Sequence, residues 1–434
     1  MNAVDFNAEA QRRRVRGELP KGWNVKPLRA FLRPVNVRNR QNAQLLSVTR
    51  ESGVIVRNVA SKEENHNFIP EDLSNYKFVT RGQFVINKMK SWQGSYGVSP
   101  CDGLVSPAYF VYDLDFPCKE FFNLAIRSKV YVPCFQRFSK GIRVDQWDLM
   151  PEALKLIQFA FPPLPEQEAI VKYLDEATGR IDKAIEAEEK MVALLQERRE
   201  IVINEAVGGG QDFNAETQRR GVRRELPKGW EVRRLRHCFA KMFSGLWGTD
   251  PSSDNSGIVC FRVADFDYAR GGVSGDKLTY RAYRNCEVAS RLVEKGDLLL
   301  EKSGGGDNSP VGRVVITDNE FTATCSNFIQ ALHCKVGYCS KYLCYVFRSL
   351  YSKRVNGYYY NQTTGIQNLK VAEYLSVEVP IPPLPEQEAI VKRLDEETGK
   401  IGRGIAVKRR QIDLLRERRE IIINEVVTGK VKVA

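Results

Sequence analysis

An eleven-residue segment occurs twice in this chain without a single change. Residues 162–172 read PPLPEQEAIVK, and the same letters return at residues 382–392, 220 positions later. Each copy opens a long charged segment, and both segments close on the letters ERREI and then INE. Self-similarity at a fixed interval marks a repeated structural unit. We therefore expect a globular part, a long helix, a second globular part and a second long helix.

A shorter repeat marks the start of each globular part. The letters LPKGW stand at residues 19–23 and again at residues 226–230, 207 positions later. Because this offset is smaller than 220, the second globular part is 13 residues longer than the first between the two shared markers. Each copy is typical of a turn that enters a first strand. We expect Trp23 and Trp230 to anchor the two cores, since a large aromatic ring is mostly buried.

Between these markers the two globular parts differ in sequence but not in pattern. Short apolar runs such as residues 84–86, 108–112, 298–300 and 314–317 are broken by Gly, Asn, Asp and Pro. That pattern predicts strands and loops, with a few helices such as residues 340–349. We expect each part to be α+β, with a twisted or barrel-like sheet.

The two charged segments carry the signals of long helices. Pro165 and Pro385 stand where a helix can begin, and acidic residues follow them at the positive end of the helix dipole. Gly208 and Gly429 fit the C-terminal stops. Apolar residues between these signals recur at spacings of 7, 4, 7, 3 and 7, which predicts a coiled-coil seam. The seam residues are Leu174, Ile181, Ile185, Val192, Leu195 and Val202 in the first helix, and Leu394, Ile401, Ile405, Ile412, Leu415 and Ile422 in the second.

One charge interrupts each seam at an equivalent place. Glu188 does so in the first helix and Lys408 in the second. We predict an antiparallel helix pair in register at these two residues, because opposite charges facing each other fix the alignment. The same register places Arg199 near Glu397. About 43 helical residues at ~1.5 Å each make a rod of roughly 60 Å.

Polar loops follow an equivalent strand in both globular parts. Residues 79–88 and 293–302 each lead through a turn glycine into an apolar strand that ends on a lysine, and glycine-rich loops come next. A second pair of loops, residues 139–146 and 364–370, lies just before each helix, and residues 358–362, YYYNQ, stand upstream of the latter. Cations, amides, hydroxyls and aromatic rings there suit phosphates and base edges, although solvated loops and half-buried tyrosines give the same letters. The DNA-contact candidates are Lys88, Lys90, Ser91, Trp92, Gln93, Lys140 and Arg143 in the first part, and Lys302, Ser303, Asn308, Arg313, Asn361, Gln362 and Gln367 in the second.

The positive charge of the chain is concentrated in its globular parts. The net charge is +13 over 434 residues. Residues 1–164 hold 24 Lys+Arg against 15 Asp+Glu, and residues 208–384 hold 24 against 18. The first helical segment, 165–207, holds only 6 against 11. Basic globular parts suit a polyanion such as DNA, although many proteins of similar charge bind no nucleic acid.

Other classes of protein find little support in the sequence. No run of ~18 apolar residues predicts a membrane span, and the basic N-terminal residues lack the apolar stretch of a signal peptide. Ten scattered cysteines without a Cys-x-x-Cys pair favour reduced thiols in the cytoplasm. Neither an amino-methyltransferase motif nor a phosphate-binding loop is present. The residues His333, Cys334, Cys339 and Cys344 do not have the spacing of a zinc site, so we expect no bound metal. Because the motifs of both enzyme classes are missing, we also expect no cofactor and no catalysis by this chain.

The doubled PPLPEQE at each helix start and the doubled ERREI at each helix end resemble the specificity (S) subunits of type I restriction–modification systems. The resemblance covers the whole chain. It implies two target-recognition domains, each reading one half of a bipartite sequence in double-stranded DNA. It also implies a pseudo-twofold tandem repeat, in which two helices hold the domains apart and dock two methyltransferase (M) subunits. Restriction (R) subunits would join through the M–S complex.

On this basis we predict four segments. They are a first target-recognition domain (1–164), a first spacer helix (165–207), a second target-recognition domain (208–384), and a second spacer helix with the C-terminal tail (385–434). Two alternatives stay open at this point. One is an architectural scaffold that uses the helical rod without reading sequence, and the other is a nuclease or methyltransferase in its own right.

Overall fold

The computed structural model describes residues 20–38, 40, 43–59, 72–141, 147–209, 226–251, 257–274, 277–306, 309–363 and 365–433. The chain forms two compact units. Unit 1 comprises residues 1–189 and 410–434, and unit 2 comprises residues 190–409. Each unit therefore combines one globular part with a stretch of both long helices. Among the described residues, no helix has the length and apolar character that crossing a membrane requires.

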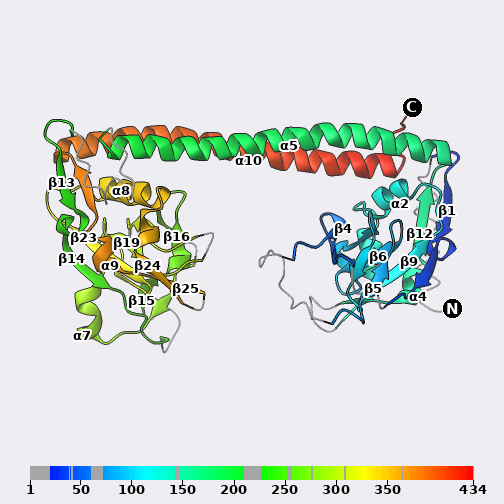
Figure 1. Ribbon diagram of the computed structural model, residues 1–434, viewed down its shortest axis with the longest axis horizontal. Helices are drawn as coiled ribbons and strands as arrows, with labels where there is room; N and C mark the ends of the chain where they lie inside the picture. Colours follow the sequence, from blue (N-terminus) through cyan, green and yellow to red (C-terminus); the bar gives the residue numbers. More distant parts are fainter. Residues whose placement is uncertain are drawn as a thin grey trace. The chain divides into compact units, whose positions relative to one another are not determined.

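Unit 1 is built on a four-stranded antiparallel sheet in the order β2-β9-β6-β7, of which Figure 1 labels β9 and β6. The strand pairs β3-β4, β5-β8 and β10-β11 form separate two-stranded sheets, and β1 pairs with β12 next to the start of the long helix. The strands are β1 (Asn24–Pro27), β2 (Leu32–Val35), β3 (Leu46–Thr49), β4 (Gly53–Val56), β5 (Lys77–Val79), β6 (Phe84–Ile86), β7 (Tyr96–Val98), β8 (Gly103–Val105), β9 (Phe110–Leu114), β10 (Ser139–Lys140), β11 (Asp148–Leu149) and β12 (Gln158–Phe161). The short helices are η1 (Leu28–Ala30), η2 (Ser91–Gln93), α2 (Lys119–Ile126), α3 (Val132–Arg137) and α4 (Pro151–Leu154).

Unit 2 repeats the central sheet in the order β14-β23-β19-β21. Its other sheets are β13-β26, β16-β17, β18-β15-β22 and β20-β25-β24. The strands are β13 (Glu231–Arg234), β14 (Phe239–Ser244), β15 (Ile258–Phe261), β16 (Phe266–Asp267), β17 (Gly272–Val273), β18 (Tyr280–Arg281), β19 (Leu298–Glu301), β20 (Ser303–Gly304), β21 (Val314–Ile316), β22 (Ala323–Cys325), β23 (Ile329–Cys334), β24 (Tyr360–Thr363), β25 (Ile366–Leu369) and β26 (Glu378–Ile381). The short helices are η3 (Leu235–Cys238), η4 (Val263–Asp265), α7 (Asn285–Val288), η5 (Ala289–Arg291), α8 (Ser340–Ser352), η6 (Val355–Tyr358) and α9 (Val371–Tyr374).

The central sheets of the two units correspond strand by strand. The strand that precedes Lys88 in unit 1, β6, lies between β9 and β7, and the strand that precedes Lys302 in unit 2, β19, lies between β23 and β21. An amphipathic helix packs on each core, α2 in unit 1 and α8 in unit 2. The predicted α+β tandem repeat is therefore confirmed, even though the two globular parts share few letters.

The long helices α5 (Leu164–Val207) and α10 (Leu384–Val427) are 44 residues each. Both begin one residue before the predicted proline and run without a break through their internal glycines. After α10 the backbone turns through Gly429 at a φ of +72°, a left-handed conformation that glycine adopts at helix ends. The corresponding residue after α5 is Gly209, with a φ of +59°.

The two helices run antiparallel, as predicted. In unit 1 the early part of α5 lies beside the late part of α10, where Glu189 pairs with Arg416 at 2.8 Å and Asp182 with Arg419 at 2.9 Å. In unit 2 the late part of α5 lies beside the early part of α10, where a Cβ on Gly404 would stand 3.7 Å from Leu195 Cδ1.

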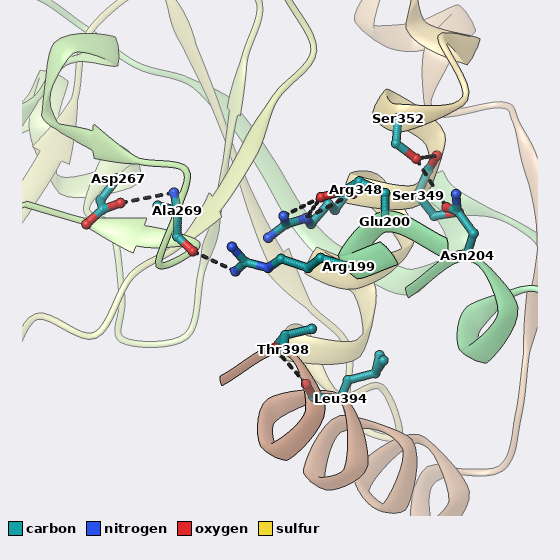
Figure 2. A network of polar contacts seen from close by, with 10 residues as sticks. All are labelled: Arg199, Glu200, Asn204, Asp267, Ala269, Arg348, Ser349, Ser352, Leu394 and Thr398. Atoms are coloured by element: carbon teal, nitrogen blue, oxygen red, sulfur yellow. Dashed lines mark hydrogen bonds and ion pairs between the residues drawn. The ribbon is translucent and has the colours of Figure 1, made fainter. Parts of the chain in front are cut away.

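The predicted register, which sets Glu188 opposite Lys408, is not tested by the antiparallel contacts within each unit. Glu188 belongs to unit 1 and Lys408 to unit 2, so their pairing stays a prediction. Arg199, which that register places near Glu397, donates from Nη2 to the carbonyl oxygen of Ala269 at 2.7 Å (Figure 2).

The first residue of each predicted seam is buried in a globular core. Leu174 of α5 is buried in the core of unit 1, and Leu394 of α10 takes the equivalent place in unit 2. Further along the helices, the seam residues are less completely buried. Ile181, Ile405 and Ile412 are buried, whereas Leu195, Ile401 and Leu415 are only half-buried. The seam residues that pack on the globular parts are therefore more completely buried than most of those between the two helices.

The repeated helix start makes the same contacts in both units. The indole Nε1 of Trp23 donates to Glu166 Oε1 at 3.1 Å, and that of Trp230 donates to Glu386 Oε1 at 2.9 Å. The side-chain amide of the next residue, Gln167 or Gln387, donates back to the carbonyl oxygen of the first proline in the motif, at 2.8 Å in each copy. These contacts tie the first strand of each globular part to the helix that follows it.

The repeated helix end holds the globular part of its own unit as well. In unit 2 the Glu200 carboxylate accepts from both Nε and Nη2 of Arg348 on α8, and Ser352 donates to Asn204 Oδ1 at 3.2 Å (Figure 2). In unit 1 the residues 220 positions later make equivalent contacts with the globular part. Glu420 forms an ion pair with Lys129, whose backbone N–H donates to Asn424 Oδ1 at 2.9 Å.

We expect the Glu200→Gln variant to lower the free energy of unfolding by about 1–2 kcal/mol, because a two-point, charge-assisted contact with Arg348 is lost. Urea denaturation followed by circular dichroism measures this change. Glu205→Gln, on an exposed position of the same helix, is the matched control. Equal midpoints for the two variants would show that Glu200 does not anchor α8.

Candidate nucleic-acid interface

In each unit the structure joins the two loop regions that the sequence offered separately. The backbone N–H of Leu149 on β11 donates to the carbonyl oxygen of Lys88 at 3.0 Å. In unit 2 the backbone N–H of Leu369 on β25 donates to the carbonyl oxygen of Lys302 at 2.7 Å. The lysine that ends the central strand therefore meets a hairpin in both units, β10-β11 or β24-β25.

Around this junction in unit 1, the lysines are better placed for a ligand than the serine. Lys88 Nζ pairs with Asp148 Oδ2 at 2.9 Å, while Lys90 and Lys140 are exposed. Ser91 is fully buried and donates to the carbonyl oxygen of Lys88 at 3.2 Å. DNA contact by Ser91 stays a prediction, and in this structure the buried side chain supports the loop from inside.

Two tryptophans lie together in the same region. The rings of Trp92 and Trp147 are 5.2 Å apart between centroids, at an interplanar angle of 42°. The indole nitrogen of Trp92 is buried and finds no hydrogen-bond partner among the described residues. Gln93 beside it is half-buried, and Arg143 lies outside the described residues. The Trp92 ring is thus held by another ring and not by a polar contact.

In unit 2, Lys302 and Gln367 shape the loop that follows β19. Lys302 Nζ donates to Ser244 Oγ at 2.6 Å, and partial burial lowers the pKa of this lysine. Gln367 is 1% exposed, and its Oε1 accepts from the backbone N–H of Val311 at 3.1 Å. We predicted that Gln367 contacts DNA, but its burial makes it a support of the glycine-rich loop. Asn308 lies outside the described residues.

Arg313 is another candidate that the structure assigns to support. Its Nε lies 2.9 Å from Oε2 of Glu301, a carboxylate that is 1% exposed, and its guanidinium carbon lies 3.8 Å from the centre of the Tyr268 ring. Burial raises the pKa of the Glu301 carboxyl, and the arginine opposes that shift. The guanidinium therefore compensates a buried charge, and DNA contact by Arg313 is not what this geometry favours.

A few of the polar side chains near Lys302 in unit 2 are exposed to solvent. Asn361 and Gln362 on β24 are exposed, and Ser303 on β20 is half-exposed. Sequence reasoning missed Asn368 on β25, which is exposed and whose Oδ1 accepts from Ser303 Oγ at 2.8 Å. It also missed Asp148, which stands 220 positions earlier and immediately before the matching leucine. The offset of the long repeat was the signal that could have found both residues. Within the described ranges, no three His, Cys, Asp or Glu side chains gather to hold a metal ion.

Comparison with known proteins agrees with this architecture. Residues 227–404 match a family described as the type I restriction modification DNA specificity domain. The chain is also similar to the putative type I restriction enzyme MjaX specificity subunit of Methanocaldococcus jannaschii, with 22% identity over 96% of this chain and 95% of that one. The StySPI specificity subunit of Salmonella potsdam is 21% identical over 88% of this chain and 83% of its own length.

Over most of its length the chain is thus similar to specificity subunits of type I restriction–modification systems. A solved structure described as "Structural basis underlying complex assembly and conformational transition of the type I R-M system" shares the fold, with a TM-score of 0.68. That comparison covers 95% of this chain and 100% of the other, at 16% identity.

We expect the Glu301→Ala variant to unfold more easily by about 2–3 kcal/mol, because Arg313 would lose the partner that compensates its partial burial. Chemical denaturation measures the difference. The control is Glu320→Ala, which removes a solvent-exposed pair with Lys295 and should leave the unfolding midpoint almost unchanged. A loss at Glu301 as small as the loss at Glu320 would contradict this account of the Arg313 side chain.

Proposed function

We propose that this specificity subunit reads an asymmetric, bipartite DNA sequence, with one half-site recognised by residues 1–164 and the other by residues 208–384. The observation that carries the proposal is the equivalence of the two hairpins. Lys140 and Asp148 face each other across β10-β11, and Asn361 and Asn368 occupy the same places across β24-β25. The same framework thus presents different chemistry, so the two half-sites should differ.

Charge supports double-stranded DNA as the ligand. Both globular parts carry net positive charge, and exposed lysines such as Lys90 and Lys140 stand beside the hairpin of unit 1. Lysine contacts with phosphates supply affinity that depends on salt but not on sequence. Side chains on the hairpins then add discrimination between bases.

We further propose that the chain itself catalyses nothing and needs no cofactor. Partner subunits would act on the DNA, an adenine methyltransferase (M) bound directly, in two copies, and a restriction (R) subunit bound through the M–S complex. This arrangement would work in the cytoplasm, where host DNA and reduced cysteines are both found.

An exposed apolar stripe on the long helices supports the docking of M subunits. Leu194 is 58% exposed and Ile201, seven residues on, is 38% exposed. The residues 220 positions later, Leu414 and Ile421, are 46% and 47% exposed. Apolar side chains seven residues apart form the contact surface of a coiled coil. We call these residues the outer stripe of each helix, Leu194 and Ile201 in unit 2 and Leu414 and Ile421 in unit 1, and assign each stripe to a helix of an M subunit.

The outer stripe makes docking testable. We expect Leu194→Glu combined with Leu414→Glu to reduce binding of the M subunit at least about 10-fold, because each substitution places a charge in an apolar contact. Binding is measured by co-purification and calorimetry. The matched control is Gln196→Glu, which adds a negative charge at an exposed polar position of α5. Equal binding by the double variant and the control would remove the outer stripe from the docking surface.

The reading of two half-sites has its own test. We expect co-expression of the chain with its methyltransferase partner to produce methylated adenines within one split, asymmetric motif of fixed gap, detected by single-molecule sequencing of host DNA. Replacement of residues 1–164 by the corresponding domain of another specificity subunit should change one half of the motif and leave the other half intact. A stable complex that gives no motif would instead support a scaffold without sequence reading.

A further inference from the structure

The small sheet β20-β25-β24 presents a row of polar side chains on one face. Ser303 pairs with Asn368, and Asn368 pairs with Asn361 on its other side, so the three residues lie side by side across three strands. Residues on neighbouring positions of a strand point to opposite faces. Gln367 and Leu369 are buried at 1% and 7% exposure, so the face that carries Asn368 is the outer one.

Asn368 is oriented before any ligand binds. Its Oδ1 accepts the hydroxyl hydrogen of Ser303 at 2.8 Å, which sets the direction of the amide. A second lone pair of that oxygen and the two amide hydrogens remain available, since no other described residue bonds them. One acceptor and one donor in this arrangement match the N6–H and N7 groups of adenine in the major groove.

The next outward position on β25 is apolar. Ile366 is 47% exposed at the tip of the hairpin, two residues from Asn368 and therefore about 7 Å away along the strand. An exposed apolar side chain next to an amide suits the methyl group of thymine, which lines the major groove beside the adenine groups. The outer face of the hairpin thus offers one partner for each base of an A·T pair.

Two exposed cations flank the hairpin in sequence. Arg354 stands before η6, which leads into β24, and Lys370 directly follows β25 and lies 3.8 Å from Glu373 Oε2. The backbone N–H of Lys370 donates to the carbonyl oxygen of Tyr359 at 2.7 Å, which fixes the base of the hairpin. A two-stranded ribbon has the width to enter the major groove of B-form DNA, and flanking cations can then contact the phosphates.

We propose that Asn368, positioned by Ser303, reads an adenine in the half-site of residues 208–384, with Ile366 against the thymine methyl group of the same A·T pair. This inference rests on the proposed function. It deepens it by naming a base pair and the side chains that distinguish it. Asn368 is the specificity-determining residue and Ser303 is a positioning residue. In unit 1 the equivalent positions hold Lys140 and Asp148, so the hairpin of the first half-site has no such partner for adenine.

The test uses the full chain co-expressed with its methyltransferase partner, and the readout is the methylated motif in host DNA. We expect Asn368→Ala to reduce discrimination at one A·T position by about 10- to 100-fold, in the half-site of residues 208–384 only. The half-site of residues 1–164 should stay unchanged, which shows in the same experiment that the variant chain folds and assembles. Ser303→Ala should loosen the same position less strongly, because Asn368 is still present but free to rotate. Ser376→Ala, which removes an exposed hydroxyl on another part of unit 2, is the matched control.

The outcomes separate this inference from the proposed function. A split motif that Asn368→Ala leaves unchanged overturns the role of Asn368 while the reading of two half-sites stands. A half-site of residues 208–384 without any A·T pair overturns it too. A wild-type chain that assembles with its partner and yields no motif overturns the proposed function, and the inference with it. Relaxation confined to one A·T position, strong in Asn368→Ala and weaker in Ser303→Ala, supports it.

Discussion

The structure depends on how each globular part is held by the long helices. In each unit an indole N–H bonds a glutamate in the first turn of one helix, Trp23 to Glu166 or Trp230 to Glu386. The end of the other long helix holds the same globular part through a glutamate and an asparagine four residues apart. The identical letters of the repeat are the residues that make these contacts. The sequence between them is free to differ as long as it keeps the four-stranded sheet.

The polar residues of the loops and hairpins beside Lys88 and Lys302 divide into a buried group and an exposed group. Buried groups such as Ser91, Gln367 and the pair of Glu301 with Arg313 hold loop backbone in place, and each has a bonded partner because an unpaired polar group inside a protein is costly. Exposed groups on the hairpins keep bonding capacity for a ligand. Rigid support beneath a small exposed surface lets a few side chains set specificity, since less conformational freedom is lost on binding.

The limits of prediction follow from the same division. The long helices were predictable to within one residue at their start, because a heptad pattern and a proline are local signals. The order of the strands within each sheet was not predictable, since neighbouring strands pair through residues that are distant in sequence. Ser91, Gln367 and Arg313 have the residue types of DNA contacts, yet they face inward. In a strand, one position decides which face a side chain takes, so Gln367 is buried and Asn368 beside it is exposed.

The helices show how one sequence repeat can serve two kinds of contact. The inner seam includes Leu195 and Val202, and the outer stripe includes Leu194 and Ile201, each one residue earlier. Neighbouring residues on a helix are about 100° apart around its axis, since a turn takes 3.6 residues. An apolar seven-residue spacing at both positions therefore gives each helix two separate apolar faces. The globular parts and the helix pair use the first face, and the second, solvent-facing face is the one that the proposed docking of M subunits would cover.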